Sequence, residues 1–181
     1  MLNNALYIMF LMAADPAVTA GPLPLECVYA ATSFDDEQLI GGLAARGGGQ
    51  QTEIEAAAVK RLMAADKGCR KANGWSADKT KTAVDYARAK FLYDYGKQQL
   101  TQRSLPIGPV EKTYARLAPE ARTALMAGAA DSSVLTILTE ELKKAKLKPS
   151  QVGREEGRLM GNMLVAKALA DKAQTAFDTT R

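Results

Sequence analysis

The spacing of apolar residues is the feature that most constrains this chain, because beyond residue 50 it repeats with the pitch of a helix rather than of a strand. Thr52 and Glu55 form a capping-box pattern that marks a helix start. The apolar residues that follow fall within an arc of about 80° when each residue turns by about 100°: Ile54, Ala58, Leu62, Ala65 and Cys69. Asn73-Gly74 supplies a left-handed stop. The pattern predicts a helix that buries this stripe.

Further helices are predicted from caps, from proline at a first helical position and from the same three- and four-residue spacing. Asp35 is the expected N-cap of a short helix that Gly47-Gly48-Gly49 end. Ser76 is the expected cap of a long helix that continues to about Gln102. Beyond it the predicted helices span 110–117, 119–127, 132–145 and 151–177.

The run Leu105-Pro106-Ile107-Gly108-Pro109 interrupts the helical pattern near the middle of the chain. We interpret residues 104–109 as a connector inside one domain, because neither half alone has many large apolar residues. The expected fold class is therefore all-α: an irregular helical bundle of about five to seven helices, forming a single domain over residues 21–181.

The absence of histidine limits the chemistry of the chain. It excludes Ser-His-Asp and Cys-His catalysis, histidine-ligated haem and zinc sites built with imidazole, and the two cysteines cannot complete a four-cysteine site. The formal net charge is +4, and bases and acids are interspersed rather than segregated. We therefore expect no metal, no cofactor and no nucleic-acid partner.

The N-terminus carries an apolar run of ten residues, Ala5 to Ala14, which Asp15-Pro16 ends. This run is too short for a membrane-spanning helix, so no stable membrane span is expected. Small residues at Val18-Thr19-Ala20 predict a signal peptide, residues 1–20, with cleavage after Ala20 and a periplasmic or secreted bacterial protein. No Lys or Arg precedes the run, and the alternative is a hydrophobic helix that docks on the core of a cytoplasmic protein.

Cys27 and Cys69 are the only two cysteines. Cys69 lies on the apolar stripe of its predicted helix, and Cys27 lies in an irregular segment just beyond the predicted cleavage site. An exported protein with two cysteines usually pairs them, so we predict a disulfide that links the mature N-terminus to the core. Two buried, reduced thiols are the alternative.

The last predicted helix carries two features of interest. Gly153, Gly157 and Gly161 recur every fourth residue, a spacing that predicts close helix packing, with a ligand-contacting groove as the alternative. Glu156 projects near the centre of the apolar stripe, where desolvation is expected to raise its pKa. It is the one weak candidate for a catalytic residue; the alternative is a structural acid near the helix start.

These patterns predict an exported helical protein without evident catalytic machinery, which binds a protein partner or serves as an envelope accessory protein. Two other functions stay open. One is a small helical hydrolase that acts on glycan or peptide through carboxylates such as Glu156, and the other is a cytosolic helical adaptor. Tyr86, Tyr93 and Tyr95 lie on one predicted helix and form either part of the core or an aromatic surface for a partner or a sugar.

Overall fold

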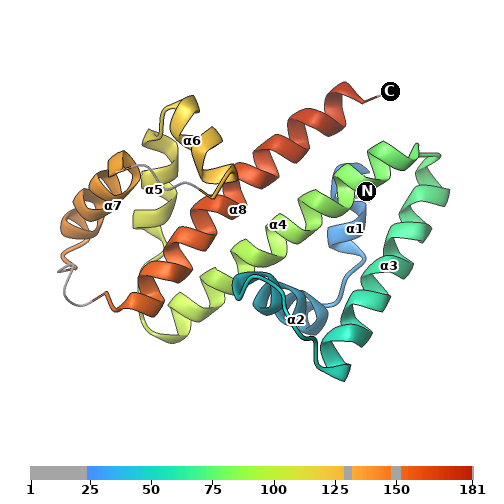
Figure 1. Ribbon diagram of the computed structural model, residues 1–181, viewed down its shortest axis with the longest axis horizontal. Helices are drawn as coiled ribbons and strands as arrows, with labels where there is room; N and C mark the ends of the chain where they lie inside the picture. The colour runs from blue at the N-terminus through green and yellow to red at the C-terminus, as the bar shows by residue number, and fades with distance from the viewer. Residues whose placement is uncertain (1–23, 129–131, 148–151, 181) are drawn as a thin grey trace, which may run out of the picture.

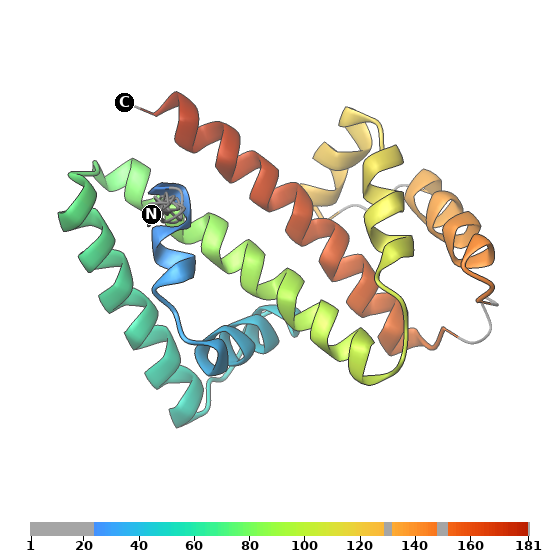
Figure 2. The same cartoon turned by 180° about the vertical axis from the view of Figure 1, so that it is seen from behind.

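Two long antiparallel helices, α4 (Ala77–Gln102) and α8 (Arg154–Thr179), form the centre of the molecule (Figures 1 and 2). The computed structural model describes residues 24–128, 132–147 and 152–180. Contacts at both ends set the register of the pair. Lys79 Nζ donates to the carbonyl oxygen of Thr180 at 3.0 Å, and Arg103 just beyond α4 pairs with Glu156 at 2.6 Å. The start of each long helix therefore lies beside the end of the other.

The remaining helices form two groups on opposite sides of this pair, one packed against α4 and the other against α8 (Figure 1). The N-terminal group consists of the 3-10 turn η1 (Pro24–Glu26), α1 (Cys27–Ala30), α2 (Phe34–Ala45) and α3 (Glu53–Asn73). The other group consists of α5 (Gly108–Arg116), α6 (Pro119–Met126) and α7 (Ser132–Lys144). All regular elements of the described residues are helical, which confirms the predicted all-α class. The helix that the sequence did not predict is α1, because its four residues are too few to show a period.

Local caps set both boundaries of α3 and the start of α4 as predicted. The Thr52 side chain accepts a hydrogen bond from the Glu55 N–H, the reciprocal half of the capping box is also made, and Gly74 ends α3 with φ of 63°. Ser76 caps α4 as predicted. The cap predicted for α2 is wrong by two residues: Ser33, not Asp35, accepts from the backbone, and Phe34 is 60 % exposed.

The core consists of two clusters that both include residues of α4 and α8. The first joins α4 and the end of α8 to the N-terminal group, and its largest members include Leu25, Val28, Trp75, Phe91 and Phe177. The second joins the other half of the pair to α5, α6 and α7, around Leu100, Val110, Leu138, Met160 and Met163. Because the long helices run through both clusters, the two groups of helices form one domain.

The predicted buried stripe of α3 holds only in part. Ala58, Leu62 and Cys69 are buried, but Ile54 is 65 % exposed. In that first turn the buried side chain is instead Glu55, because its carboxylate closes the capping box and accepts from Arg46 at 2.6 Å. At the start of α3 the hydrogen bonds of Glu55 therefore decide which side chain is buried, and Ile54 beside it stays exposed.

The predicted close packing through Gly157 and Gly161 is wrong. An ideal Cβ atom built on either glycine meets nothing within 4 Å among the described residues, and one built on Gly153 meets the carboxylate of Glu156 in its own helix. Close approach occurs at two other glycines. A Cβ on Gly41 would meet the carbonyl oxygen of Phe91, and one on Gly96 would lie 2.5 Å from Met163 Cγ.

Alanine at Gly157 and Gly161 is therefore expected to stabilise the protein. Each substitution removes backbone freedom from the unfolded chain and meets no neighbour in the fold, so each should raise the free energy of unfolding by up to about 1 kcal/mol. Urea denaturation followed by circular dichroism measures this. Loss of stability would mean that another surface packs closely on this face.

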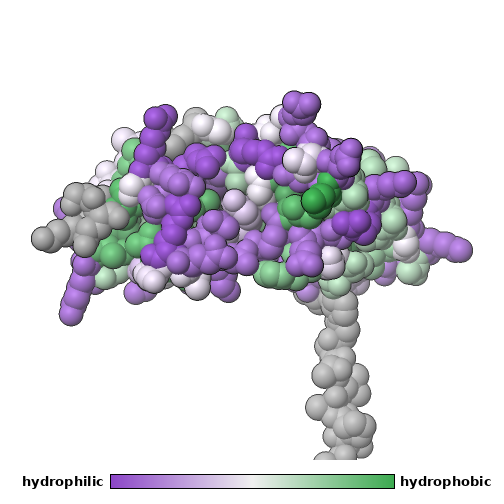
Figure 3. Space-filling view, turned by 90° about the horizontal axis from the view of Figure 1, so that it is seen from below, coloured by the Kyte–Doolittle hydropathy of each residue, from purple (hydrophilic) through white to green (hydrophobic). Residues whose placement is uncertain are grey.

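The outer surface is mostly polar. On the face shown in Figure 3, hydrophilic side chains predominate and apolar ones are exposed in separate patches. Among the described residues, the exposed large apolar side chains belong to α2, α3 and α7: Phe34, Ile54, Met63 and Leu135. In the part of the chain that the structure describes, no helix is both long and apolar enough to cross a membrane.

Candidate functional site

The two cysteines lie together, at the junction of α1 and α3. Their sulfur atoms are 2.06 Å apart, which is disulfide-bond distance, and their Cα atoms are 5.9 Å apart. The Asn73 amide donates to the carbonyl oxygen of Cys69, one helical turn before it. The pair joins segments 42 residues apart in the sequence. The predicted cleavage site after Ala20 lies outside the described residues.

Glu156 is brought into an ion pair rather than into an apolar cleft. Its side chain is 21 % exposed, and its carboxylate accepts from Arg103 at 2.6 Å, while the same guanidinium donates to Glu155 at 2.8 Å. Hydrogen bonds from backbone N–H groups, first its own, together with Arg103, lower the pKa of Glu156. The predicted raised pKa is therefore wrong, because the start of α8 and a neighbouring cation favour the ionised form.

A row of alternating tyrosines and cations crosses five helices on one side of the α4–α8 pair. Lys90 Nζ lies 5.3 Å from the ring centre of Tyr29 and 6.0 Å from that of Tyr93. Lys167 Nζ lies 5.8 Å from Tyr93 and 5.1 Å from Tyr114, and the Arg122 guanidinium lies 4.7 Å from Tyr114. We call this row the tyrosine seam: Tyr29, Lys90, Tyr93, Lys167, Tyr114 and Arg122. The spacing of each pair is that of a cation–π contact.

The hydroxyl groups of the seam are also held. Tyr29 donates to Asp94 at 2.9 Å, Tyr93 to Glu111 at 3.0 Å and Tyr114 to Asp171 at 2.6 Å. Burial, and then these carboxylates, raise the pKa of all three tyrosines above their usual value of 10. The hydroxyls therefore remain protonated hydrogen-bond donors at neutral pH. Each ring is held by a cation at its face and by a carboxylate at its hydroxyl group.

A shallow groove opens beside the middle of the seam, and we call it the seam groove. It has a volume of about 330 Å³ and lies between Tyr86, Lys90 and Tyr93 on one wall and Lys167, Asp171 and Gln174 on the other. Tyr86 donates to Glu26 at 3.2 Å, and burial together with that carboxylate raises its pKa to about 12. Two lysines and the carboxylates of Glu111 and Asp171 line the groove, so its charge is balanced.

The sequence indicated part of this surface. Tyr86 and Tyr93 line the groove, as the aromatic-surface alternative for α4 requires, whereas Tyr95 packs against Gly41 and Gly42 of α2. The spacing 86, 90, 93 already places one lysine and two tyrosines on one helical face. Lys167 and Tyr114 were missed, because no local pattern relates them to α4.

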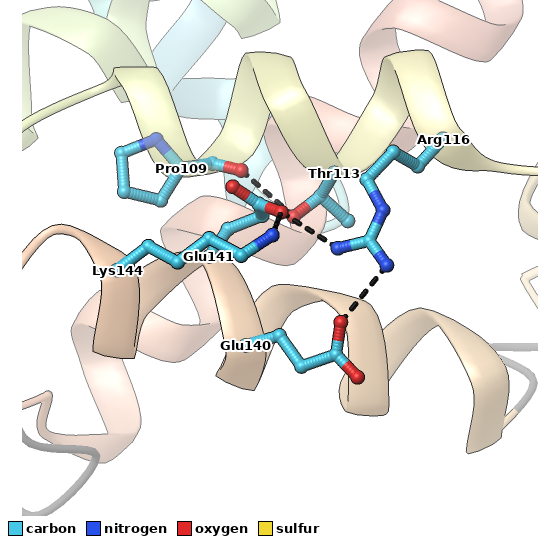
Figure 4. Close-up of polar contacts among 6 residues, drawn as sticks. All are labelled: Pro109, Thr113, Arg116, Glu140, Glu141 and Lys144. Carbon is cyan, nitrogen blue, oxygen red and sulfur yellow. Dashed lines mark hydrogen bonds and ion pairs between the residues drawn. The ribbon is translucent and has the colours of Figure 1, made fainter.

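A second polar cluster joins α5 to α7 (Figure 4). The Glu141 side chain is 4 % exposed and accepts from Arg116 at 2.6 Å and from Lys144 at 2.7 Å. Arg116 also reaches Glu140 at 2.9 Å. Hydrogen bonds from Lys144 and then Arg116 lower the pKa of Glu141. An ionised carboxylate bound by two cations in this way holds α7 against α5.

Acid is expected to weaken the protein through Glu141. Since its folded-state pKa lies below the usual value of 4.5, its ion pairs stabilise the fold above that value, and the contribution is lost as the pH falls through the folded-state pKa. Unfolding curves in urea between pH 7 and pH 3 should show this decline, and Glu141→Gln should flatten it. Glu140→Gln is the control at neutral pH: its half-exposed side chain pairs with the same arginine, and its loss should change stability little. A Glu141→Gln profile parallel to wild type would contradict the assignment.

The carboxylates of the described residues are the remaining candidates for metal binding and acid–base chemistry. Among the residues that the structure describes, no group of three or more Cys, Asp or Glu is placed to hold a metal ion. The carboxylates with lowered pKa, such as Asp36 with Arg61 and Glu55 with Arg46, are ion-paired. The chain matches no protein-family model, no curated protein and no solved structure. The seam groove is therefore the candidate functional site on geometric grounds.

Proposed function

We propose that this is an exported, non-enzymatic helical protein that binds another protein through the seam groove. The observation that carries the proposal is the row of tyrosines whose rings contact cations and whose hydroxyls are bound by carboxylates. Tyrosine and arginine are enriched in protein interfaces, and side chains fixed before binding lose little entropy when a partner docks. A preorganised aromatic surface therefore favours the binding of a partner protein over catalysis.

The charge of the groove favours a protein partner over a polyanion. Lys90 and Lys167 alternate with Glu111 and Asp171, so the surface presents both signs at close spacing. Nucleic acids and other polyanions are bound by surfaces of one sign. A folded protein, whose surface carries both charges and hydrogen-bonding groups, is the complementary partner.

Export is part of the proposal. The apolar run before residue 15, the small residues before Gly21, and a cysteine pair at disulfide distance all favour an oxidising compartment, the periplasm or the outside of the cell. Mass spectrometry of the protein isolated from the cells that make it tests this. A mature N-terminus at Gly21 supports export, and retention of Met1 contradicts it.

Photo-crosslinking tests the binding surface. A p-benzoylphenylalanine residue replaces Gln174 in the groove, or, as the control, Lys67 on the exposed side of α3, and the protein is irradiated in its native host. We expect one discrete protein adduct at position 174 that Tyr93→Ala abolishes, and none at position 67. Circular dichroism of Tyr93→Ala checks that the variant is folded. Identical adducts at both positions, or none at 174, would overturn the proposal.

A further inference from the structure

A second groove lies along the opposite side of the α4–α8 contact. Its volume is about 490 Å³, within the range of small-molecule sites. Leu169, Ala173 and Ala176 of α8 provide an apolar floor, and Lys81 and Arg88 of α4 together with Lys172 of α8 provide a cationic rim. Because each residue of a helix turns by about 100°, these residues lie on different faces from those of the seam groove. We call it the basic groove.

The cations of this groove lack sufficient carboxylate partners. Lys81 pairs with Asp85 at 2.7 Å, but within the described ranges Arg88 and Lys172 have no carboxylate at ion-pair distance. Asp85 raises the pKa of Lys81, and Arg88 acts in the opposite direction, which places two cations near each other. With three cations and one carboxylate, the lining has a net charge of +2. By contrast, Arg103 and Arg116 are each bound by two carboxylates.

The register of the long helices places the two unpaired cations at one level. Lys79 contacts Thr180 and Arg103 contacts Glu156, so residues at the same level have numbers that add to about 259. Arg88 is then level with residue 171, next to Lys172 on the other rim. The apolar floor continues from there through Ala173 and Ala176 toward Phe177, whose ring packs on Trp75 at 5.4 Å. The groove thus has two unpaired cations at one end, and toward the other end an apolar floor that the Lys81–Asp85 pair borders.

We propose that the basic groove binds a free amphiphilic anion, a long-chain carboxylate whose head group lies between Arg88 and Lys172 and whose chain lies on Ala173 and Ala176. Two cations that face each other stabilise one carboxylate by charge-assisted hydrogen bonds. The methylene stems of Lys81 and Lys172 extend the apolar floor, because long basic side chains cover apolar surface while their charged ends stay in water. The site is separate from the protein-binding surface proposed above.

Titration of the purified chain with three probes tests this site. Dodecanoate below its micellar concentration supplies anion and chain, dodecyltrimethylammonium supplies the chain with a positive charge, and inorganic phosphate supplies the anion alone. Calorimetry measures affinity, and the fluorescence of Trp75, the single tryptophan, reports on the adjacent end of the groove. We expect dodecanoate to bind at least tenfold more tightly than either other probe.

Charge variants locate the binding. Arg88→Glu/Lys172→Glu should weaken dodecanoate binding at least tenfold, and Arg88→Gln/Lys172→Gln, which is milder for folding, should weaken it in the same direction. The matched control Lys60→Glu/Lys67→Glu makes the same charge change on exposed residues of α3 and should leave the affinity unchanged. The proposal is overturned if dodecyltrimethylammonium binds as tightly as dodecanoate, if the control variant loses as much affinity as the groove variant, or if dodecanoate does not bind. Binding of the protein only to vesicles of anionic phospholipid would overturn it as well.

Discussion

Replacing Cys27 and Cys69 together by alanine is expected to lower the free energy of unfolding by about 4 kcal/mol. The cysteines are 42 residues apart. In the chain-entropy model, a closed loop of that length raises the free energy of the unfolded chain by this amount, because it lowers the chain's entropy. Small domains are stable by only about 5–15 kcal/mol, so the loss is a large fraction of the total. Urea denaturation followed by circular dichroism measures it.

Reduction of the wild-type protein is the control for the cysteine variant. Wild type in excess dithiothreitol should unfold at the urea concentration of the double variant, and the variant should not respond to the reductant. The effect should be strongest in α3, which packs mainly on α2 and has few contacts with either α1 or α4, so hydrogen exchange should rise there first. Coincident curves for oxidised wild type and variant would mean that the native thiols are not bridged, and would remove one support for export.

Alanine at Gly41 is expected to destabilise the protein by about 2 kcal/mol, although alanine favours helices over glycine by about 1 kcal/mol. The added Cβ would meet the carbonyl oxygen of Phe91 and lie 2.7 Å from Tyr95 Cβ. These are backbone and backbone-attached atoms, which cannot rotate away, so α2 must move off α4. Ile40 and Leu43, buried on either side of Gly41, would lose packing with it.

Gly68→Ala is the matched control for Gly41→Ala. Gly68 also lies inside a helix, but a Cβ there meets nothing within 4 Å among the described residues. This variant should gain up to about 1 kcal/mol, so the two substitutions are expected to have opposite signs in the same urea assay. Stabilisation by Gly41→Ala would show that α2 and α4 do not approach as closely as the structure places them.

Two predictions about α8 were wrong: close packing at its glycines and a raised pKa for Glu156. The regular row on α8 suggested close packing, yet the glycines that helices approach are Gly41 and Gly96, each without a repeat around it. The position of Glu156 on the apolar side of α8 suggested desolvation, but Arg103 follows α4, more than fifty residues earlier in the chain, and pairs with it. Neither contact could be predicted from a local pattern, because the residues that meet are far apart in the sequence.

Local chemistry determined the helices of this protein. Thr52, Gly74 and Ser76 mark boundaries as predicted, because a cap depends on hydrogen bonds within about four residues of the chain. Periodicity likewise predicted the all-α class. The tertiary structure alone decided which faces meet, how the tyrosine seam joins five helices and which cations lack partners, because those features depend on side chains brought together from distant helices.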